Sequence, residues 1–350
     1  MLPVRVAARA PLAGPVVGSG AHFERVTLEI AGESIATVLK VIATDSTLGP
    51  TRERRFYEEL APKLRARLPR LYASGPFPGR DDGWILLEEL PRPQRWKPVR
   101  AFDAVRAIAR VHAQTLAQAP DWLPRPFGRD LQSHLAFVPE ALDRLEALQR
   151  RLPVLRNLAR PRTFELAREL LRRPERLRRA FADSPEAVIH GDMHSGNVWL
   201  APGGEPIVFD WESVAAGPPV FDVTLLYQYL QIRQLRIPGR AAEVGWWRPG
   251  APRFDRLLDV YLVAFEREGL ASLPRRALTS AVDGAFAWEA LLRMGWAASQ
   301  LEEHAPGPLL RLTHVPGLRA FGRIGDRAAL YAAWQAMFRD LESRAEALLG

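Results

Sequence analysis

The sequence contains no cysteine among its 350 residues. This absence excludes disulfide bonds, zinc sites built from thiolates and enzymes with a cysteine nucleophile. Long apolar runs are also absent: none approaches the ~18 residues that a membrane-spanning helix needs. The N-terminal segment MLPVRVAARAPLAGPVVG lacks the apolar core of ~7–15 residues that marks a secretory signal. We therefore expect a cytoplasmic protein with no membrane partner.

Lysine is nearly absent. Lys40, Lys63 and Lys97 are the only lysines among 48 basic residues. Arginine therefore supplies positive charge almost everywhere. A position that keeps lysine is a candidate for a role that a compact ammonium fills better than a planar guanidinium.

The net charge of +8 is concentrated in one segment. Residues 100–180 hold 17 arginines against 9 aspartates and glutamates, and the rest of the chain sums to zero. Such an excess could contact a polyanion. No interleaved aromatic residues or RNA-binding motif accompany it, however. Solvated helix faces explain the charge better, and we expect no nucleic-acid partner.

Secondary-structure signals divide the chain near residue 91. Residues 12–90 show strand patterns, one helix and a turn signal at Ala31-Gly32. Pro91-Arg92-Pro93 interrupts this pattern, and helical periodicity dominates afterwards. We predict an α+β fold with a small antiparallel sheet and one helix in an N-terminal lobe, 1–91, and a mainly helical C-terminal lobe, 92–350. Strands are expected at 16–17, 25–30, 34–42, 70–72 and 84–87, and helices at 50–60, 139–151, 163–182, 220–233, 252–268, 274–302 and 327–348.

A polar run, HGDMHSGN, extends from His190 to Asn197 between short apolar segments. Asn197 follows Asp192 by five positions, and Asp210 lies 18 positions beyond Asp192. Phosphoryl transfer needs a carboxylate that orients the attacking hydroxyl, and hard oxygen ligands for magnesium. Protein kinases supply these groups with an Asp, an Asn five residues later and a second Asp further on. A buried polar cluster or a run of turn residues is the alternative, but the combined pattern is too specific for it.

The segment between Asn197 and Asp210 is typical of a β-hairpin. Gly203-Gly204 favours a two-residue turn, because glycine tolerates positive φ. In that register the numbers of cross-strand partners sum to 407, which places Asn197 opposite Asp210 with Cβ atoms ~4.5–5.5 Å apart. One magnesium ion can bridge that separation.

The runs HGDMHSGN and VFDWE resemble the aminoglycoside phosphotransferase family and its choline-kinase-like relatives, which share the protein-kinase fold. The resemblance extends over most of the chain. It implies a protein-kinase-like bilobal fold, ATP and Mg²⁺ as cofactors, Asp192 as the catalytic base, and Asn197 and Asp210 as metal ligands. It also implies that His190 and His194 shape the loop and do not titrate during catalysis.

The same resemblance implies a nucleotide site in the N-terminal lobe. Lys40 resembles the strand lysine that contacts the α- and β-phosphates of ATP. Glu53, within the helix pattern Arg-Glu-x-x-Phe-Tyr-x-x-Leu, resembles its carboxylate partner. Gly18, Ser19 and Gly20 resemble a shortened phosphate loop, whose backbone N–H groups approach anionic oxygens. The segment before the proline break resembles the hinge that binds adenine, and three residues stay open as the contact: Glu88, Glu89 and Leu90.

Two further residues match family positions. We interpret His112 as a core histidine with satisfied hydrogen bonds. We interpret Asp222, in the run GPPVFD, as a structural residue that holds the catalytic loop.

The phosphate acceptor is the least determined part. Residues 215–305 hold 10 arginines against 10 aspartates and glutamates. The acidic excess that receives polyamine substrates in aminoglycoside kinases is therefore missing. Aromatic faces could stack on a sugar ring or cover a quaternary ammonium. The candidates for an acceptor site, for which amphipathic packing is the better explanation, are Asp283, Trp288, Glu289, Trp296 and the pair Trp246-Trp247.

We predict an ATP- and Mg²⁺-dependent phosphotransferase, a kinase acting on a hydroxyl of a small molecule such as an amino sugar, sugar or amino alcohol. A protein Ser/Thr kinase of the stress-response type is one alternative. Against it, Trp211 and Glu212 stand where protein kinases have Phe-Gly, and no Ala-Pro-Glu motif follows. A non-catalytic pseudokinase module is the second alternative, and the retained Lys40 and Asp192 argue against it. The acceptor, the choice between ATP and GTP, and the oligomeric state stay open.

Overall fold

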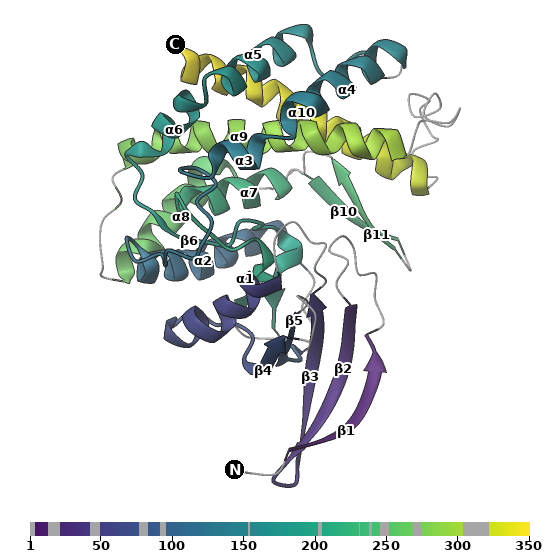
Figure 1. The fold of residues 1–350 in the computed structure, drawn as a ribbon, viewed down its shortest axis with the longest axis vertical. Helices are drawn as coiled ribbons and strands as arrows, with labels where there is room; N and C mark the ends of the chain where they lie inside the picture. The colour runs from purple at the N-terminus through teal and green to yellow at the C-terminus, as the bar shows by residue number, and fades with distance from the viewer. Residues whose placement is uncertain are drawn as a thin grey trace.

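An antiparallel sheet and a larger helical body make up the molecule (Figure 1). The computed structural model describes residues 4–12, 22–42, 50–76, 83–91, 96–152, 155–201, 205–230, 232–237, 240–245, 252–268, 273, 275–303 and 322–350. The sheet precedes the helical body in the chain, and the predicted α+β class is confirmed.

The N-terminal sheet has five antiparallel strands. They are β1 (Val4–Pro11), β2 (His22–Ile30), β3 (Glu33–Ile42), β4 (Leu71–Pro76) and β5 (Gly83–Glu88), in the spatial order β1-β2-β3-β5-β4. The turn predicted at Ala31-Gly32 is confirmed, because both residues have positive φ, 53° and 85°, as a two-residue hairpin turn requires. The strands expected from the sequence do not include β1. It is an edge strand, and all of its residues are exposed. The strand expected at 16–17 lies outside the described residues.

One helix connects the sheet to the loop that contains Trp211. α1 (Pro50–Arg55) continues directly into a π-helical turn that ends at Leu60. Phe56, at the junction, is fully buried, and its ring stacks on Trp211 with the centroids 4.0 Å apart. This stack fixes the helix that carries Glu53 against the loop that contains Trp211.

The rest of the described chain is mainly helical. Its helices are α2 (Ala101–Thr115), α3 (Leu131–Leu135), α4 (Val138–Arg151), α5 (Pro161–Arg172), α6 (Pro174–Ala182), α7 (Val220–Leu230), α8 (Phe254–Arg267), α9 (Arg275–Glu303) and α10 (Gly322–Leu349).

Two of the expected helices differ from those observed. The helix predicted at 163–182 is interrupted at Arg173, because Pro174 has no N–H to continue the ladder and instead starts α6 at its first position. The helix predicted at 220–233 ends at Leu230, and a hairpin of β10 (Ile232–Ile237) and β11 (Arg240–Gly245) follows. Apolar residues of this short hairpin continue the helical period of α7, so periodicity alone does not mark the change.

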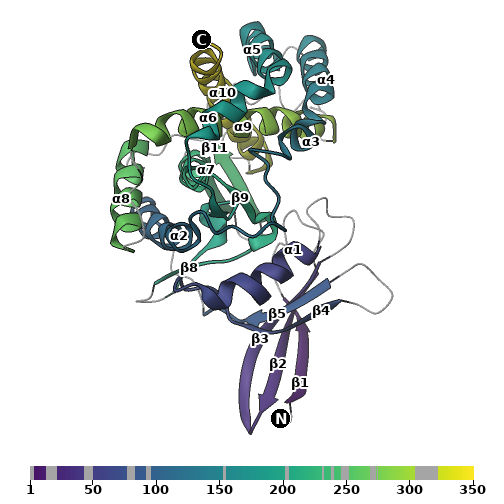
Figure 2. The same ribbon diagram turned by 60° about the vertical axis from the view of Figure 1, so that its left-hand side comes forward.

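α9 lies in the middle of the helical body, where α4, α7 and α10 pack against it (Figures 1 and 2). Trp288 on α9 is 2% exposed, and its ring centroid lies 5.1 Å from that of Phe127. Trp288 therefore belongs to the core, as the packing explanation predicts.

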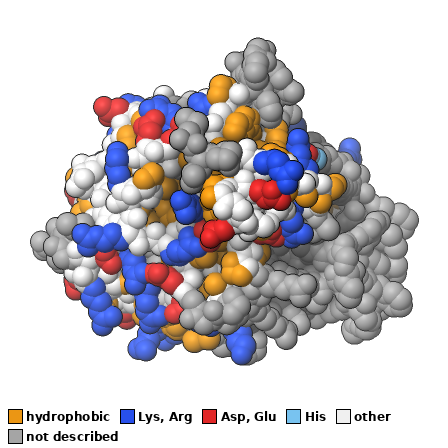
Figure 3. Space-filling view, turned by 90° about the horizontal axis from the view of Figure 1, so that it is seen from below, with side chains coloured by type: hydrophobic (Ala, Val, Ile, Leu, Met, Phe, Trp, Pro, Cys, Tyr) orange, Lys and Arg blue, Asp and Glu red, His pale blue; other side chains and the backbone are white. Residues whose placement is uncertain are grey.

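Charges of both signs share the surface. On the face in Figure 3, Lys and Arg side chains lie beside Asp and Glu side chains. Many arginines of segment 100–180 are paired, among them Arg125 with Glu186 and Arg168 with Asp143 and Glu146. Within the described ranges, no helix combines the length and the apolar character that crossing a membrane requires.

Candidate active site

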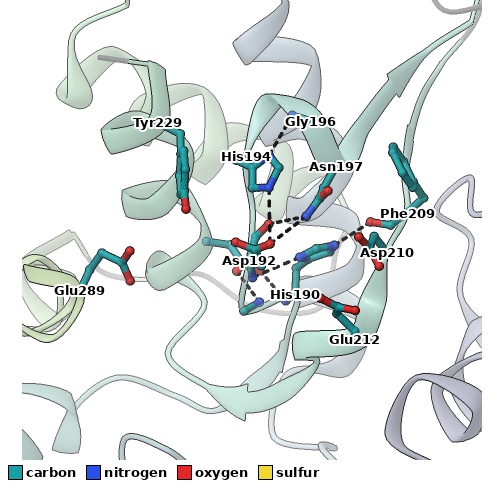
Figure 4. A network of polar contacts seen from close by, with 12 residues as sticks. His190, Asp192, His194, Gly196, Asn197, Phe209, Asp210, Glu212, Tyr229 and Glu289 are labelled. Carbon is teal, nitrogen blue, oxygen red and sulfur yellow. Dashed lines mark hydrogen bonds and ion pairs between the residues drawn. The ribbon is translucent and has the colours of Figure 1, made fainter. Parts of the chain in front are cut away.

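Two short strand pairs frame the polar run His190–Asn197. β6 (Ala187–Ile189) pairs with β9 (Ala215–Gly217) before the run, and β7 (Val198–Leu200) pairs with β8 (Pro206–Val208) after it. The run therefore leaves one ribbon and enters the other, and its polar side chains gather at the junction (Figure 4).

The β7–β8 register differs by one residue from the prediction. Cross-strand partners sum to 406, as in Val198 with Val208, and the backbone N–H of Phe209 donates to the Asn197 carbonyl over 3.1 Å. The five residues between the two strands are an odd number, which a two-residue turn at Gly203-Gly204 cannot produce. Those two glycines lie outside the described residues. Asn197 therefore lies opposite Phe209 and not opposite Asp210.

The backbone of Asp210 departs from the strand. Its φ of 64° and ψ of 63° are left-handed, a conformation that costs a non-glycine residue about 1–3 kcal/mol. The departure carries the Asp210 carboxylate to the Lys40 ammonium, with Oδ1 2.5 Å from Nζ. Figure 4 shows the carboxylate on the same side of the loop as Glu212.

Three carboxylates surround one ammonium group in the interior. Lys40 Nζ lies 2.8 Å from Glu53 Oε2, 2.5 Å from Asp210 Oδ1 and 3.4 Å from Glu212 Oε2. The predicted pairing of Lys40 with Glu53 is therefore present. Glu212 also belongs to this cluster, although its sequence position indicated only a difference from protein kinases. Its position two residues after Asp210, across a single 3-10 turn, is the sequence feature that could have predicted its place in the cluster.

The pKa values in this cluster reflect its charge imbalance. Burial alone would lower the pKa of Lys40, but the charges of Glu53, Asp210 and Glu212 outweigh burial and raise it above the usual value. Burial raises the pKa of Glu53 to about 7, with repulsion from Asp210 and Glu212 adding to it. Burial and repulsion by Asp210 also raise the pKa of Glu212. Lys40 and Arg52, which also interacts with Glu212 and Glu53, supply two positive charges for three carboxylates.

The cluster has the chemistry of a divalent-cation site. One carboxylate oxygen each of Glu53, Asp210 and Glu212 lies within 4.8 Å of the others. Glu53 Oε1 is buried and accepts no hydrogen bond from a described residue. Hard oxygen ligands and excess negative charge fit Mg²⁺.

Asp192 is fixed by Asn197 and His194. Asn197 Nδ2 donates to the Asp192 carbonyl over 2.9 Å and to its carboxylate Oδ2 over 3.1 Å. His194 Nδ1 accepts from the Gly196 N–H over 2.9 Å. The proton of His194 therefore belongs on Nε2, which lies 3.4 Å from Asp192 Oδ2. The carboxylate has a defined position and keeps a second oxygen, Oδ1, for another partner.

The same bonds control the ionisation of Asp192. Burial would raise its pKa, but the hydrogen bond from His194 and the favourable electrostatic interactions with His194, His190 and the Arg293 guanidinium outweigh burial and hold the pKa below its usual range. Asp192 is therefore an ionised carboxylate at neutral pH.

Asp222 holds the start of the loop. Its Oδ2 accepts from the His190 N–H over 2.6 Å, and its Oδ1 accepts from the Gly191 N–H over 3.0 Å. His112 Nε2 lies 3.0 Å from Oδ2, and His112 Nδ1 lies 3.0 Å from the Tyr261 hydroxyl. All these polar groups are buried and mutually bonded. The interpretations of Asp222 as a loop-holding residue and of His112 as a satisfied core histidine are confirmed.

We expect Gly191→Ala to destabilise the fold. Gly191 has a φ of 80°, and a Cβ there would collide with the backbone carbonyl of Ser213. Strain of this kind costs about 1–3 kcal/mol, and the collision adds to it. Urea denaturation should show an unfolding free energy lower by about 2 kcal/mol or more. Gly128→Ala is the control, since its Cβ would meet nothing closer than 3.8 Å. Equal effects of the two substitutions would contradict the prediction.

In the proposed hinge, the side chains of Glu88 and Glu89 form hydrogen bonds with neighbouring residues of the N-terminal region. Glu88 bonds to Arg67 and to the Arg70 N–H, and Glu89 receives two bonds from Arg25 Nε at 2.8 and 2.9 Å. The backbone N–H groups of both glutamates are used as well, by the carbonyls of residues 70 and 36. Among the described residues, the Leu90 N–H has no acceptor. Gly18, Ser19 and Gly20 lie outside the described residues.

A second group of side chains lies on the other side of Asp192. Tyr229 from α7 and Glu289, Arg293 and Trp296 from α9 form this group, which we call the α7–α9 cluster. The His194 ring lies against Tyr229, 4.9 Å between centroids, and Figure 4 shows Tyr229 and Glu289 across Asp192 from Phe209 and Asp210.

Only some of the residues predicted as acceptor-site candidates lie in this cluster. Glu289 and Trp296 belong to the α7–α9 cluster, whereas Asp283 is paired with Arg344 and Trp288 is in the core. The sequence did not identify Arg293 and Tyr229 as acceptor-site candidates, because an arginine and a tyrosine on helices have no distinguishing sequence pattern. Trp246-Trp247 lies outside the described residues.

Comparison with solved structures shows the fold. A microcompartment-associated aminopropanol kinase superposes with a TM-score of 0.55 at 14% identity, covering 98% of this chain and 94% of that one. An aminoglycoside phosphotransferase from Alicyclobacillus acidocaldarius gives 0.56 at 14%, covering 98% and 93%. The choline kinase LicA from Streptococcus pneumoniae gives 0.51 at 13%, covering 97% and 95%. The predicted protein-kinase-like fold is confirmed.

Sequence comparison shows the family. Methylthioribose kinase from Erwinia tasmaniensis is 30% identical over 177 residues, which is 45% of this chain and 44% of that protein. The alignment thus spans less than half of this curated relative. A model of the phosphotransferase enzyme family matches residues 14–258. Because this match covers more than half of the chain and includes the loop, the α1 helix and the Asp210 segment, the protein belongs to the phosphotransferase enzyme family, which confirms the family resemblance of its motifs.

Proposed function

We propose that this protein transfers the γ-phosphoryl group of ATP, with Mg²⁺, to a hydroxyl of a small molecule. The observation that carries the proposal is the position of the ionised Asp192 between two groups of residues. The charged cluster of Lys40, Asp210 and Glu212 lies on one side, and the α7–α9 cluster lies on the other. This arrangement separates a site for phosphates and metal from a site for an acceptor.

Asp192 acts as the base. Asn197 and His194 hold its Oδ2, so Oδ1 accepts a hydrogen bond from the attacking hydroxyl and orients its oxygen toward the phosphate. As the oxygen attacks, its proton passes to the Asp192 carboxylate. The low pKa of Asp192 keeps this carboxylate unprotonated before the reaction.

The remaining residues serve the nucleotide and metal. Asp210 and Glu212 would hold Mg²⁺, which when bound neutralises phosphate charge, and Asn197 as a further ligand stays a prediction. Lys40 binds the phosphates, and Glu53 fixes its ammonium. The Leu90 N–H is the best hinge donor for adenine, because those of Glu88 and Glu89 are used. The phosphate loop Gly18-Ser19-Gly20, the lobe boundary at residue 91 and a cytoplasmic location stay predictions.

A phosphoacceptor screen tests this proposal. The full chain is incubated with labelled ATP and Mg²⁺ and with panels of sugars, sugar alcohols, amino sugars and amino alcohols, or with proteins. We expect transfer to small hydroxyl compounds that depends on added Mg²⁺. Transfer to protein alone would favour the Ser/Thr kinase alternative. Failure to bind ATP, measured by titration calorimetry, would leave the pseudokinase alternative.

A further inference from the structure

The α7–α9 cluster is built around a fixed arginine. Arg293 Nε lies 2.5 Å from Glu289 Oε1, and Nη2 donates to the Tyr229 hydroxyl. The side chains of Arg293 and Glu289 are 18% and 6% exposed. An ion pair this far from water has few alternative arrangements, so the guanidinium is a constant feature of this side of the active site.

Arg293 also occupies the aromatic surfaces of the cluster. Its Cζ lies 5.0 Å from the ring centroid of Tyr229 and 4.9 Å from that of Trp296. These rings are the groups that would attract the ammonium of a cationic ligand. Since a cation is already present at both rings, an ammonium entering here meets a like charge.

The positive charge of Arg293 is permanent. Burial would lower its pKa, but the negative charges of Glu289 and Asp192 outweigh burial and raise the pKa above the usual value. Arg293 bonds to Tyr229, whose ring lies 4.9 Å from that of His194, and His194 in turn holds Asp192, so the guanidinium lies on the side of the loop where Asp192 would hold the reacting hydroxyl. The field of Arg293 therefore acts on the part of the acceptor nearest to the reaction.

The cluster also offers a donor, an acceptor and an apolar face. The bonds of this pair to each other and to Tyr229 use Arg293 Nε and Nη2 and Glu289 Oε1, and do not involve Arg293 Nη1 and Glu289 Oε2. Trp296 is 60% exposed, unusual for so large an apolar side chain. Neighbouring hydroxyl groups can donate to a carboxylate and accept from a guanidinium, and the apolar face of a sugar ring can cover an indole.

We propose that the α7–α9 cluster selects a neutral polyhydroxylated acceptor, of the sugar or sugar-alcohol class, and discriminates against acceptors with an ammonium group. This inference rests on the proposed transfer to a hydroxyl held by Asp192. The Glu289 carboxylate already balances the Arg293 guanidinium and is not available to balance the charge of an incoming ammonium, whereas hydroxyl groups need no such balance. Selection against ammonium comes from the repulsive element, Arg293, beside the base.

Matched acceptor pairs test the inference. The kcat/KM with ATP and Mg²⁺ is measured for D-glucose against D-glucosamine, glycerol against 3-aminopropane-1,2-diol, and ribitol against its 1-amino analogue. In the unmodified protein we expect the neutral member to be preferred by about tenfold or more, because a guanidinium opposes the ammonium at short range. The double variant Glu289→Gln, Arg293→Met removes both charges and leaves no buried charge unpaired. In it the preference should fall to near unity.

An exposed arginine of α9, Arg275, provides the control. Arg275→Gln removes a charge at the far end of the helix and should keep the preference of the unmodified protein. Preference for the ammonium member in the unmodified protein, or an unchanged preference in an active double variant, would overturn the inference and leave the phosphotransferase intact. Absence of transfer to every hydroxyl compound, charged or neutral, would overturn the proposed function itself.

Discussion

The Asp192→Asn variant is expected to lose about three orders of magnitude in kcat, within the range that removal of a general base produces. Asparagine has the shape of aspartate and can still contact Asn197 and His194, so the loop keeps its geometry. Its amide cannot accept the proton of the attacking hydroxyl. The proposed nucleotide contacts are those of Lys40 and the hinge, so the Kd for ATP should change by less than about threefold, or under 1 kcal/mol.

Turnover and nucleotide binding are measured separately for this variant. Initial rates of ADP formation with a phosphorylated acceptor give kcat, and titration calorimetry with a non-hydrolysable ATP analogue gives Kd. Asp183→Asn is the matched control, because Asp183 is exposed at the end of α6 and should tolerate the change. Near-normal turnover by Asp192→Asn would show that another group accepts the proton.

Asp210→Asn is expected to weaken metal-dependent activity most strongly. The substitution removes one of the negative charges around Lys40 and replaces a carboxylate ligand with a weaker amide. Because a bound metal contributes several kcal/mol of charge stabilisation, kcat should fall by about a thousandfold. Asparagine also tolerates the left-handed backbone that residue 210 requires, which alanine would tolerate less well.

Two measurements separate the metal role of Asp210 from a structural one. The Mg²⁺ concentration for half-maximal activity should rise by about tenfold or more, and the rise in Tm on adding Mg²⁺ with ATP should shrink. The Tm without ligands should change little, since Lys40 keeps Glu53 and Glu212. Glu205→Gln, exposed on the same hairpin, is the control. A variant with lower Tm but unchanged Mg²⁺ dependence would point to a structural role alone.

The local sequence was sufficient to predict the contacts between groups that lie close together in the chain. Asp192 and Asn197 are five residues apart, and their hydrogen bonds form within one loop. The turn at Ala31-Gly32 follows from the backbone freedom of a short glycine turn, and the break before α2 follows from proline. In each case the physical constraint acts over a few residues, so the pattern predicts it.

The β7–β8 hairpin shows where local pattern fails. Two glycines favour a two-residue turn, but the observed connection has five residues, and the register changes by one. Asp210 reaches Lys40 through a left-handed backbone, a conformation that the residue type permits but does not require. The stack of Trp211 on Phe56 and the ion pair to Lys40 stabilise it, and both partners come from the other end of the chain.

The sequence by itself therefore determined the family, the α+β class and the candidates Lys40, Asp192, Asn197 and Asp210. The tertiary structure decided that Glu212 joins the charged cluster and that Arg293 and Tyr229 lie on the other side of Asp192. The reason is physical. Local motifs record which groups a reaction needs, whereas the charge and shape of the acceptor side arise from side chains on α7 and α9 that only helix packing brings together.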